Sequence, residues 1–324
     1  MRAAICEAYG GPEVVSVREV PALQPKPGEI LIRTRAATVT SGDARVRGAN
    51  FPPGMALPVR LFLGIRRPRK PILGTELAGT VAAVGRGVSK FQVGDAVFAF
   101  SGGNFGCHAE LKTMPEGGAV CPLPRGASFE EAAALSFAGT TALYFLRDLG
   151  TVKPGERVLV NGASGAVGMA AVQIARHLGA HVTGVCSAAN IEAVRALGAQ
   201  DVIDYATTDF AASGERWDAI LDAVGNAPFT RSKQALAQGG RLLAVVAGLG
   251  DMLKAPVQSL SGSSKALVGV APERAEDLAT LKSLYEAGVY KPVIDSRYPL
   301  ADVAKAHAHV DTGRKTGSVL VIFD

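Results

Sequence analysis

Hydrophobic and polar residues follow one pattern up to about residue 120 and a different one beyond it. In the first part, apolar residues occur in short alternating, β-branched or aromatic runs, as at 30–35, 79–85 and 95–100. Turn-forming sequences at 85–87 and 93–95 lie between the second and third of these runs. Short runs separated by turns are typical of β-strands. This part of the chain therefore predicts a compact β-barrel-like unit with one irregular loop.

From Ser128 onward, strand-like runs alternate with helical stretches. Ser128 followed by Glu131 is a capping-box pattern, which is typical of a helix start. Strand-like runs occupy 158–160, 181–186, 201–205, 217–224 and 241–246, and helical stretches occupy 169–178 and 191–197. This alternation predicts an α/β fold with a doubly wound parallel sheet that is covered by helices on both faces.

The pattern changes again near residue 265. The tail predicts, in order, a helix at 275–287, a strand at 293–300, a helix at 301–310 and a strand at 318–323. A length of 324 residues favours two domains, because a domain typically has about 150 residues. We place the first boundary where the pattern changes, at 120–128, and the second near 265.

Composition excludes several classes of protein. Hydrophobic residues make up 48% and charged residues 19%, which excludes a disordered chain. A net charge of +5 over 324 residues is too dilute to require a nucleic-acid partner. The four cysteines are far apart, so neither a disulfide framework nor a cysteine zinc site is expected. No signal peptide or apolar run long enough to cross a bilayer is visible, so we expect a cytoplasmic protein without a membrane partner.

The most informative motif is a glycine-rich turn between a strand at 158–160 and a helix. Glycines allow a tight turn and a close approach of the backbone to a pyrophosphate, and the helix N-terminus supplies N–H groups and partial positive charge. The spacing is G-x-x-G-x-x-G rather than G-x-G-x-x-G, but the order strand, turn, helix, strand is the one that dinucleotide binding requires. The predicted cofactor-binding residues of the turn are Gly162, Ala163, Ser164, Gly165, Ala166, Val167 and Gly168.

The end of the next strand indicates which nicotinamide cofactor is bound. NAD-binding folds place Asp or Glu there for the ribose hydroxyls. Here the strand is followed by Ser187 and Asn190, which donate hydrogen bonds and do not repel a 2′-phosphate. NADPH is therefore favoured over NADH. No Arg stands at the strand end, so the candidate cations for the phosphate are Arg195, Arg314 and Lys315, although a solvated surface charge is the simpler interpretation of each.

Seven segments together resemble the zinc-independent, quinone-oxidoreductase-like branch of the medium-chain dehydrogenase/reductase superfamily. They are GGPEVV, AATVTSGDARVR, GTELAGTVAAVG, FQVGDAVFAF, ASGAVG, LGAQDVIDY and GSVLVIF. The resemblance implies a GroES-like β-barrel catalytic domain formed by residues 1–124 and 266–324. It also implies a Rossmann dinucleotide-binding domain at 125–265.

The resemblance also bears on zinc. At the three positions that hold metal ligands in zinc-dependent members, this chain has Thr40, Thr75 and Phe137. Hydroxyls and a phenyl ring do not supply the His, Cys and carboxylate ligands that Zn²⁺ prefers. We therefore expect no metal, with Glu76 kept as a structural carboxylate. Without a Lewis acid for alcohol oxidation, hydride transfer suits acceptors that are already electrophilic, such as quinones and enones.

Further site residues follow from the resemblance. Thr40 and Asp43 match the loop that faces the nicotinamide, with Thr40 as the group that polarises an acceptor carbonyl, although a β-turn threonine bonded to its own backbone is an equal alternative. Thr141 matches a threonine at the nicotinamide edge, and we predict these three residues as catalytic. Tyr205 resembles a tyrosine against the adenosine phosphate, or is an ordinary strand-end aromatic. Ala247, Gly248 and Leu249 match the backbone beside the nicotinamide.

These observations predict an NADPH-dependent, zinc-free reductase of a quinone or an α,β-unsaturated carbonyl compound. Two alternatives stay open: an enoyl-thioester reductase, and an NADPH-binding protein that is non-catalytic or associated with nucleic acid.

The segment 50–70, with basic residues at 66–70, is either an apolar lid or a contact for an anionic substrate such as a CoA phosphate. A Cys107–His108 nucleophile pair is disfavoured. The superfamily is commonly dimeric, so we expect a homodimer, with 241–271 as a candidate pairing edge.

Overall fold

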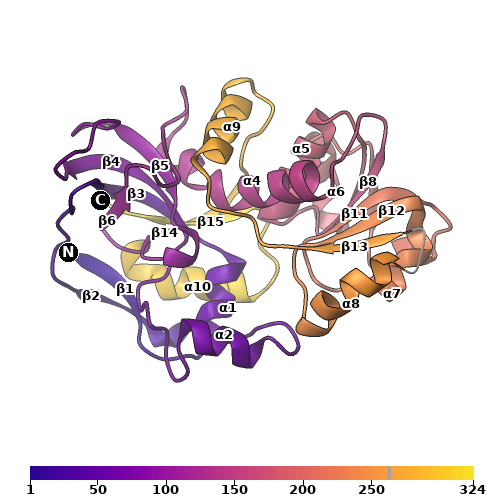
Figure 1. Ribbon diagram of the computed structural model, residues 1–324, viewed down its shortest axis with the longest axis horizontal. Helices are drawn as coiled ribbons and strands as arrows, with labels where there is room; N and C mark the ends of the chain where they lie inside the picture. Colours follow the sequence, from indigo (N-terminus) through magenta and orange to yellow (C-terminus); the bar gives the residue numbers. More distant parts are fainter. Residues whose placement is uncertain (261–263) are drawn as a thin grey trace. The chain divides into compact units, whose positions relative to one another are not determined.

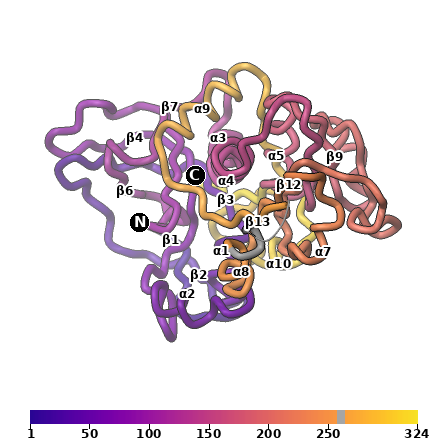
Figure 2. Tube along the Cα trace, turned by 45° about the vertical axis from the view of Figure 1, so that its right-hand side comes forward, coloured from indigo at the N-terminus to yellow at the C-terminus, as the bar shows by residue number. Residues whose placement is uncertain are grey.

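The computed structural model describes residues 1–260 and 264–324 and divides them into two compact units (Figure 1). The first unit comprises Met1–Phe51, Ala56–Phe137 and Glu273–Asp324, and the second comprises Pro52–Met55 and Ala138–Pro272. Both ends of the chain therefore belong to the first unit (Figure 2). The domain boundaries expected at 124/125 and 265/266 stay a prediction.

The second unit is built on a parallel sheet in the order β10-β9-β8-β11-β12-β13. Numbered by position in the unit, this order is 3-2-1-4-5-6, in which the winding direction reverses between β8 and β11. Ligands of such sheets bind at the carboxyl ends of the strands, at this reversal. The strands are β8 (Arg157–Asn161), β9 (His181–Cys186), β10 (Asp201–Asp204), β11 (Trp217–Asp222), β12 (Leu236–Ala244) and β13 (Lys265–Val268).

Helices cover both faces of the sheet, with α5 and α6 on one side and α7 and α8 on the other (Figure 1). Helix α5 packs on β8 and β9 and buries the unbroken run from Gly168 to Ala175, half of which is Gly or Ala. A hydrophobic core of the same unit contains Trp217, Phe210 and Phe229. The helices are α4 (Ser136–Leu143), a π-helical turn (Tyr144–Leu149), α5 (Ala166–His177), α6 (Ile191–Ala196), α7 (Phe229–Ser232) and α8 (Leu249–Leu260).

The first unit is a sheet-rich barrel-like body. Its main sheet runs β14-β15-β3-β4-β5-β7, with β6 also paired to β3, and β1 and β2 form a separate ribbon. Alternate residues such as Ile30 and Ile32 are fully buried in its core. The strands are β1 (Arg2–Cys6), β2 (Val15–Glu19), β3 (Glu29–Val39), β4 (Glu76–Val84), β5 (Ala96–Phe100), β6 (Leu111–Pro115), β7 (Val120–Pro122), β14 (Ile294–Pro299) and β15 (Ser318–Ile322). The helices are α1 (Ser41–Gly48), α2 (Ala56–Leu63), α3 (Phe129–Ala133), α9 (Ala275–Glu286) and α10 (Val303–Asp311).

The predicted fold class is confirmed, as is the capping box of Ser128 and Glu131, which starts α3. Several elements were not predicted, among them two in the first unit. The first part of the chain was expected to consist of strands with one irregular loop, but the region after β3 forms the helices α1 and α2. Helix α1 has few apolar residues, so its sequence shows no amphipathic pattern from which it could be predicted. The capping box of Thr40 and Asp43 stabilises its N-terminus. The tail helix begins at Val303 after a 3₁₀ turn, two residues later than predicted.

Candidate functional site

The glycine-rich turn joins the carboxyl end of β8 to α5, at the reversal of the sheet. The N–H groups of Gly162 and Ala163 donate to Val185 O of β9 at 3.1 and 2.9 Å, which holds the turn against the neighbouring strand. Gly162 has a φ of 82°, in the left-handed region that favours glycine. A Cβ at Gly168 would lie 2.0 Å from Gly162 O, so only glycine lets α5 start this close to the turn.

The start of α5 is suited to an anion. Its N-cap residue is Gly165, which has no side chain with which to cap the first N–H groups of the helix. The space beside Gly165 is open, because a Cβ there would meet only Gly162 O, at 3.5 Å. This cradle fits the pyrophosphate of a dinucleotide by the general logic of helix N-termini.

A buried polar network beside the turn was not predicted. Asn161 ends β8 and donates from Nδ2 to Asp222 Oδ1 of β11 at 2.9 Å and to Asn226 Oδ1 at 2.7 Å. Asp222 in turn accepts from the N–H groups of Val224, Gly225 and Ala227. The network therefore shapes the 223–227 loop exactly where the sheet reverses. A polar residue ending each of two buried strands, VLVN and AILD, was the signal in the sequence.

The predicted ribose residues gather at the ends of β9 and β10. Ser187 follows β9 directly, and Asn190 Nδ2 donates to its Oγ at 3.2 Å. The N–H of Tyr205 donates to Cys186 O at 3.1 Å, which places the backbone of Tyr205 beside the residue before Ser187. The side chain of Tyr205 is exposed. Asp204 is the neighbouring acid: it pairs with Cys186 across the strands, and its carboxylate accepts from the N–H of Ala206 at 3.0 Å.

Two of the three candidate cations for a 2′-phosphate, Arg195 and Lys315, have partners of their own. Arg195 forms an ion pair with Glu192 at 3.1 Å on the surface of α6. Lys315 donates to Gly317 O at 2.7 Å, and burial lowers its pKa to about 8. Arg314 is exposed. Of these three residues, Arg195 is the closest in the sequence to the end of β9.

The predicted nicotinamide segment follows β12 and contacts the 52–55 segment of the same unit. The N–H of Leu249 donates to Pro53 O at 2.9 Å, and the N–H of Gly248 donates to Asp251 Oδ2 at 3.1 Å. A Cβ at Gly248 would lie 2.8 Å from Pro53 O. The backbone at Ala247–Leu249 is therefore held from two sides, and the role of Pro53 was not foreseen from the sequence. Thr141 lies in α4 and is buried, one turn before the π-helical segment.

In the first unit, Thr40 and Asp43 form one compact arrangement. The N–H and hydroxyl of Thr40 both donate to Asp43 Oδ2, at 2.8 and 2.6 Å, and the N–H of Asp43 donates to Thr40 Oγ1 at 3.1 Å. Asp43 Oδ1 accepts from the N–H of Gly74 at 3.0 Å. Asp43 is fully buried, and its contact with Gly74 ties α1 to the 74–76 segment. Thr40 is a helix N-cap and not a β-turn residue.

Glu76 is a buried carboxyl group. It accepts from Thr38 Oγ1 and from the N–H of Phe137, both at 2.5 Å. Burial raises its pKa to about 8, and these hydrogen bonds only partly oppose the shift. Glu76 is therefore largely protonated at pH 7, as a neutral carboxylic acid instead of the expected carboxylate.

The three positions of the zinc ligands do not fit the metal. The Thr40 hydroxyl is used by Asp43, and the Phe137 ring has no donor atom. Thr75 Oγ1 is buried without a hydrogen-bond partner in the described part of the chain, but a lone hydroxyl is a poor ligand for Zn²⁺. Residues 1–260 and 264–324 contain no group of three or more His, Cys, Asp and Glu residues that could hold a metal ion.

Cys107 and His108 do not form an activated pair. Burial raises the pKa of the Cys107 thiol to about 12, so the nucleophilic thiolate is scarce at neutral pH. His108 Nε2 lies 2.8 Å from Thr38 O, and the His108 ring packs against the buried ring of His307 at 5.7 Å.

Comparison with known proteins identifies the family. The Alcohol dehydrogenase GroES-like domain matches residues 26–144, and the Zinc-binding dehydrogenase domain matches residues 197–321. The chain is 35% identical to the chloroplast envelope quinone oxidoreductase homolog of Arabidopsis thaliana, over 99% of this chain and 98% of that protein. It is 32% identical to the quinone oxidoreductase of Pseudomonas aeruginosa, over 97% of each.

Solved structures agree. The quinone oxidoreductase from Coxiella burnetii superposes with a TM-score of 0.89 at 25% identity, covering 100% of this chain and 99% of that one. A mycobacterial protein complexed with NADPH superposes with a TM-score of 0.81 at 28% identity, covering 100% of both chains. The chain therefore belongs to the medium-chain dehydrogenase/reductase superfamily, in its quinone-oxidoreductase-like branch, and is an oxidoreductase of that family.

In residues 1–260 and 264–324, no helix is both long enough and apolar enough to cross a bilayer.

Proposed function

We propose that the protein is a zinc-independent, NADPH-dependent reductase that transfers hydride to a quinone or an α,β-unsaturated carbonyl compound. The observation that carries the proposal is the chemistry of the positions at which related dehydrogenases hold zinc. Thr40, Thr75 and Phe137 supply no ligand set for the metal, and Thr40 is already hydrogen-bonded as a helix cap. A site without a metal cannot polarise a carbonyl through a Lewis acid, so it suits an acceptor that is already electrophilic. The quinone oxidoreductases among the relatives support the acceptor class.

The choice of NADPH rests on the end of β9. Ser187 and Asn190 offer hydrogen-bond donors where an NAD-dependent fold has a carboxylate. The related mycobacterial protein solved with NADPH supports the same choice. The turn from Gly162 to Gly168 would hold the pyrophosphate, Tyr205 would lie against the adenosine phosphate, and Ala247–Leu249 with Thr141 would border the nicotinamide. When bound, the nicotinamide supplies the hydride.

The chain's own contribution to the reaction is positioning and charge stabilisation. Negative charge develops on the acceptor oxygen as hydride arrives, and a fixed hydrogen-bond donor stabilises it. Thr40 can supply this donor if its hydroxyl hydrogen rotates from Asp43 Oδ2 to the acceptor. Asp43 remains bonded to the N–H groups of Thr40 and Gly74, so the loop keeps its shape during that change. Asp43 is then a positioning residue.

The experiment for the proposal is NADPH oxidation by chelator-treated protein with three acceptors: an ortho-quinone, an α,β-unsaturated ketone and an enoyl-CoA. We expect turnover with the quinone or the enone that survives the chelator and exceeds turnover with NADH. A preference for the enoyl-CoA would favour the enoyl-thioester reductase instead. Tight NADPH binding without turnover on any acceptor would contradict the proposal and favour a non-catalytic binding protein.

Replacing Ser187 by Asp should reverse the cofactor preference. The new carboxylate would repel a 2′-phosphate and accept from the ribose hydroxyls of NADH. We expect the ratio of kcat/KM for NADPH to kcat/KM for NADH to fall by about 100-fold, since a like-charge contact costs several kcal/mol. Steady-state kinetics with both cofactors measure the ratio. Ser187→Ala is the matched control, because it removes the hydroxyl without adding charge and should not improve NADH use. An unchanged ratio in Ser187→Asp would place the phosphate elsewhere.

Replacing Thr40 by Val should lower turnover. Valine keeps the shape of the side chain and removes the hydroxyl, so we expect kcat to fall by about 100-fold, as for the loss of one donor to a developing oxyanion. Thr40→Ser is the control, since it retains the hydroxyl and both bonds to Asp43. Loss of the N-cap alone costs about 1 kcal/mol of stability, which thermal unfolding would register separately. Near wild-type kcat in Thr40→Val would leave Thr40 a purely structural cap.

The cytoplasmic location and the homodimer stay predictions. In the described sheet, β13 pairs only with β12 and forms an edge. Light scattering during gel filtration tests the dimer.

A further inference from the structure

Helix α2 and the residues after it expose apolar side chains in an unusual concentration. Leu57, Leu61, Phe62 and Ile65 are 70%, 53%, 74% and 62% exposed. They are four of the eleven large hydrophobic side chains exposed in the described part of the chain, and they fall within nine residues. Helix α2 contains no buried residue at all. Scattered exposed apolar residues are ordinary, but a contiguous group marks an interaction surface.

The same region holds the positive charge of the chain. Residues 44–75 contain seven basic residues and no acidic one, whereas the remainder of the chain has 27 basic and 29 acidic residues. Counted along the sequence, the excess of basic over acidic residues is therefore concentrated here, although Arg47 is buried and forms an ion pair with Asp311. The basic residues are Arg45, Arg47, Arg60, Arg66, Arg67, Arg69 and Lys70.

The arginines of the loop after α2 lack acidic partners. Arg66, Arg67 and Arg69 are exposed and form no ion pair within residues 1–260 and 264–324. The nearest acid in the hollow beside them, Glu7, is paired with Arg18 at 2.8 Å. Lys70 donates to Asn104 Oδ1 at 2.9 Å. Three unpaired guanidinium groups thus stand next to the exposed apolar side chains.

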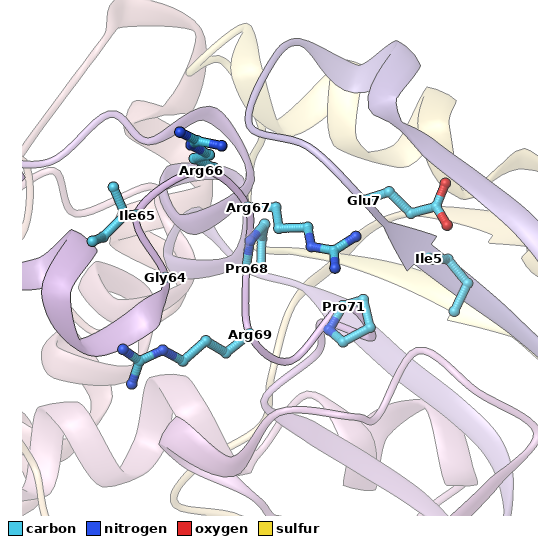
Figure 3. Close-up of a pocket in the computed structure, with 9 residues that line it drawn as sticks. All are labelled: Ile5, Glu7, Gly64, Ile65, Arg66, Arg67, Pro68, Arg69 and Pro71. Atoms are coloured by element: carbon cyan, nitrogen blue, oxygen red, sulfur yellow. The ribbon is translucent and has the colours of Figure 1, made fainter.

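The directions of these side chains argue against a small ligand. A hollow of about 540 Å³ lies beside the loop. Figure 3 shows Arg66 and Arg69 extending to opposite sides of the loop, while Arg67 points toward Glu7. A pocket for one phosphate would need donors that converge on a point. Guanidinium groups that spread outward suit instead a broad surface that carries many negative charges.

We propose that α2 and the loop 64–70 form a docking surface for an anionic lipid bilayer. Leu57 and Leu61 are four residues apart, so they lie on the same side of α2. These side chains and Phe62 would enter the boundary between headgroups and acyl chains, and Arg66, Arg67 and Arg69 would contact the anionic headgroups. The proposal departs from the expectation that the protein has no membrane partner, and it does not depend on the proposed reaction.

The combination of residues favours a bilayer over the other anionic partner, nucleic acid. Single-stranded nucleic acid is bound by cations interleaved with aromatic rings on which bases stack. Here Phe62 is the only aromatic residue between 52 and 90, and its exposed neighbours are aliphatic. Burying aliphatic side chains among lipid acyl chains is favourable, whereas contact with the phosphates of a nucleic acid does not stabilise them.

The test is co-sedimentation of the full chain with phosphatidylcholine vesicles, with and without a quarter of phosphatidylglycerol. We expect binding to the anionic vesicles only, weakened by salt because exposed charges are screened. Combined Arg66→Gln, Arg67→Gln and Arg69→Gln should weaken binding by at least about tenfold. Combined Leu61→Ser and Phe62→Ser should weaken it to a similar degree. The control combines Arg86→Gln with Val93→Ser, which removes an exposed cation and a 62% exposed apolar side chain elsewhere in the first unit.

Several outcomes would overturn the proposal. They are equal binding to neutral and anionic vesicles, no binding of the wild-type protein to either, and an equal loss of binding in the control variant. Full release of the protein from vesicles by millimolar inorganic phosphate would assign the cations to a small anion. Tighter binding to a single-stranded RNA than to vesicles would assign them to nucleic acid. A shift in oligomeric state in the Leu61→Ser, Phe62→Ser variant would assign the apolar side chains to a second copy of the chain. Because all substituted side chains are exposed, thermal unfolding should show each variant folded.

Discussion

Replacing Gly168 by Ala is expected to lower both stability and cofactor affinity sharply. The new Cβ would lie 2.0 Å from Gly162 O, and the obstacle is backbone, not a flexible side chain. Either α5 or the turn must move. We expect a loss of about 3 kcal/mol in the free energy of unfolding, at the upper end for overpacking. We also expect NADPH affinity to fall by about 100-fold, since a displacement near 1 Å has effects of this size in a tuned site.

Denaturant unfolding and fluorescence titration with NADPH measure the two effects. Gly165→Ala is the matched control for stability: it lies three residues earlier in the same turn, and its Cβ would meet only Gly162 O, at an ordinary 3.5 Å. Its unfolding midpoint should stay close to that of the wild type. Equal midpoints for Gly168→Ala and Gly165→Ala would show that α5 starts farther from the turn in solution.

Replacing Glu76 by Gln is expected to flatten the dependence of stability on pH between about pH 5 and pH 8. Burial raises the pKa of Glu76 from 4.5 to about 8, so the folded state holds a proton that the unfolded state releases. The resulting stability is fully present below pH 4.5 and is lost as pH rises toward 8. A shift of this size corresponds to at most about 5 kcal/mol. A glutamine cannot ionise, and its amide can both accept from the Phe137 N–H and donate to Thr38 Oγ1.

Thermal unfolding from pH 5 to pH 8 provides the measurement, with the wild type losing stability faster than Glu76→Gln. The carboxylate of Asp43 also raises the pKa of Glu76, so it strengthens the effect in the same direction. Lys315, which interacts with Glu76, has a pKa lowered by burial to about 8, so its own contribution changes above pH 8. Glu192→Gln removes an exposed carboxylate and should retain the wild-type slope. Parallel slopes for the wild type and Glu76→Gln would mean that Glu76 is ionised in the folded protein.

Much of the second unit could be predicted because its signals are local. Strand β8 was predicted at 158–160 and runs Arg157–Asn161, and β9 was predicted with its observed bounds. A glycine turn between a strand and a helix is specified by residues adjacent in the chain. Helix α1 was missed because its polar sequence has no apolar face, although Thr40 and Asp43 already had the spacing of a capping box.

Contacts between distant residues could not be predicted in the same way. Asn161 and Asp222 are 61 residues apart, and they meet only because the sheet order places β8 beside β11. The N–H of Gly74, 31 residues further along, donates to the buried carboxylate of Asp43, and nothing in the sequence indicated this contact. Cys107 and His108 were adjacent candidates in the sequence, yet burial of the thiol decides that they do not form a nucleophile pair.

The α/β class, the dinucleotide turn and the family resemblance could all be inferred from the sequence, since each depends on residue order over short segments. The sequence also contained the excess of basic residues between 44 and 75, which composition averaged over the whole chain concealed. How much water each group retains depends on the folded structure. Loss of water is what raises the pKa of Glu76, while access to water is what leaves Phe62 and the arginines of the 64–70 loop available to a partner. Burial is a property of packed neighbours, and those neighbours come from distant parts of the chain.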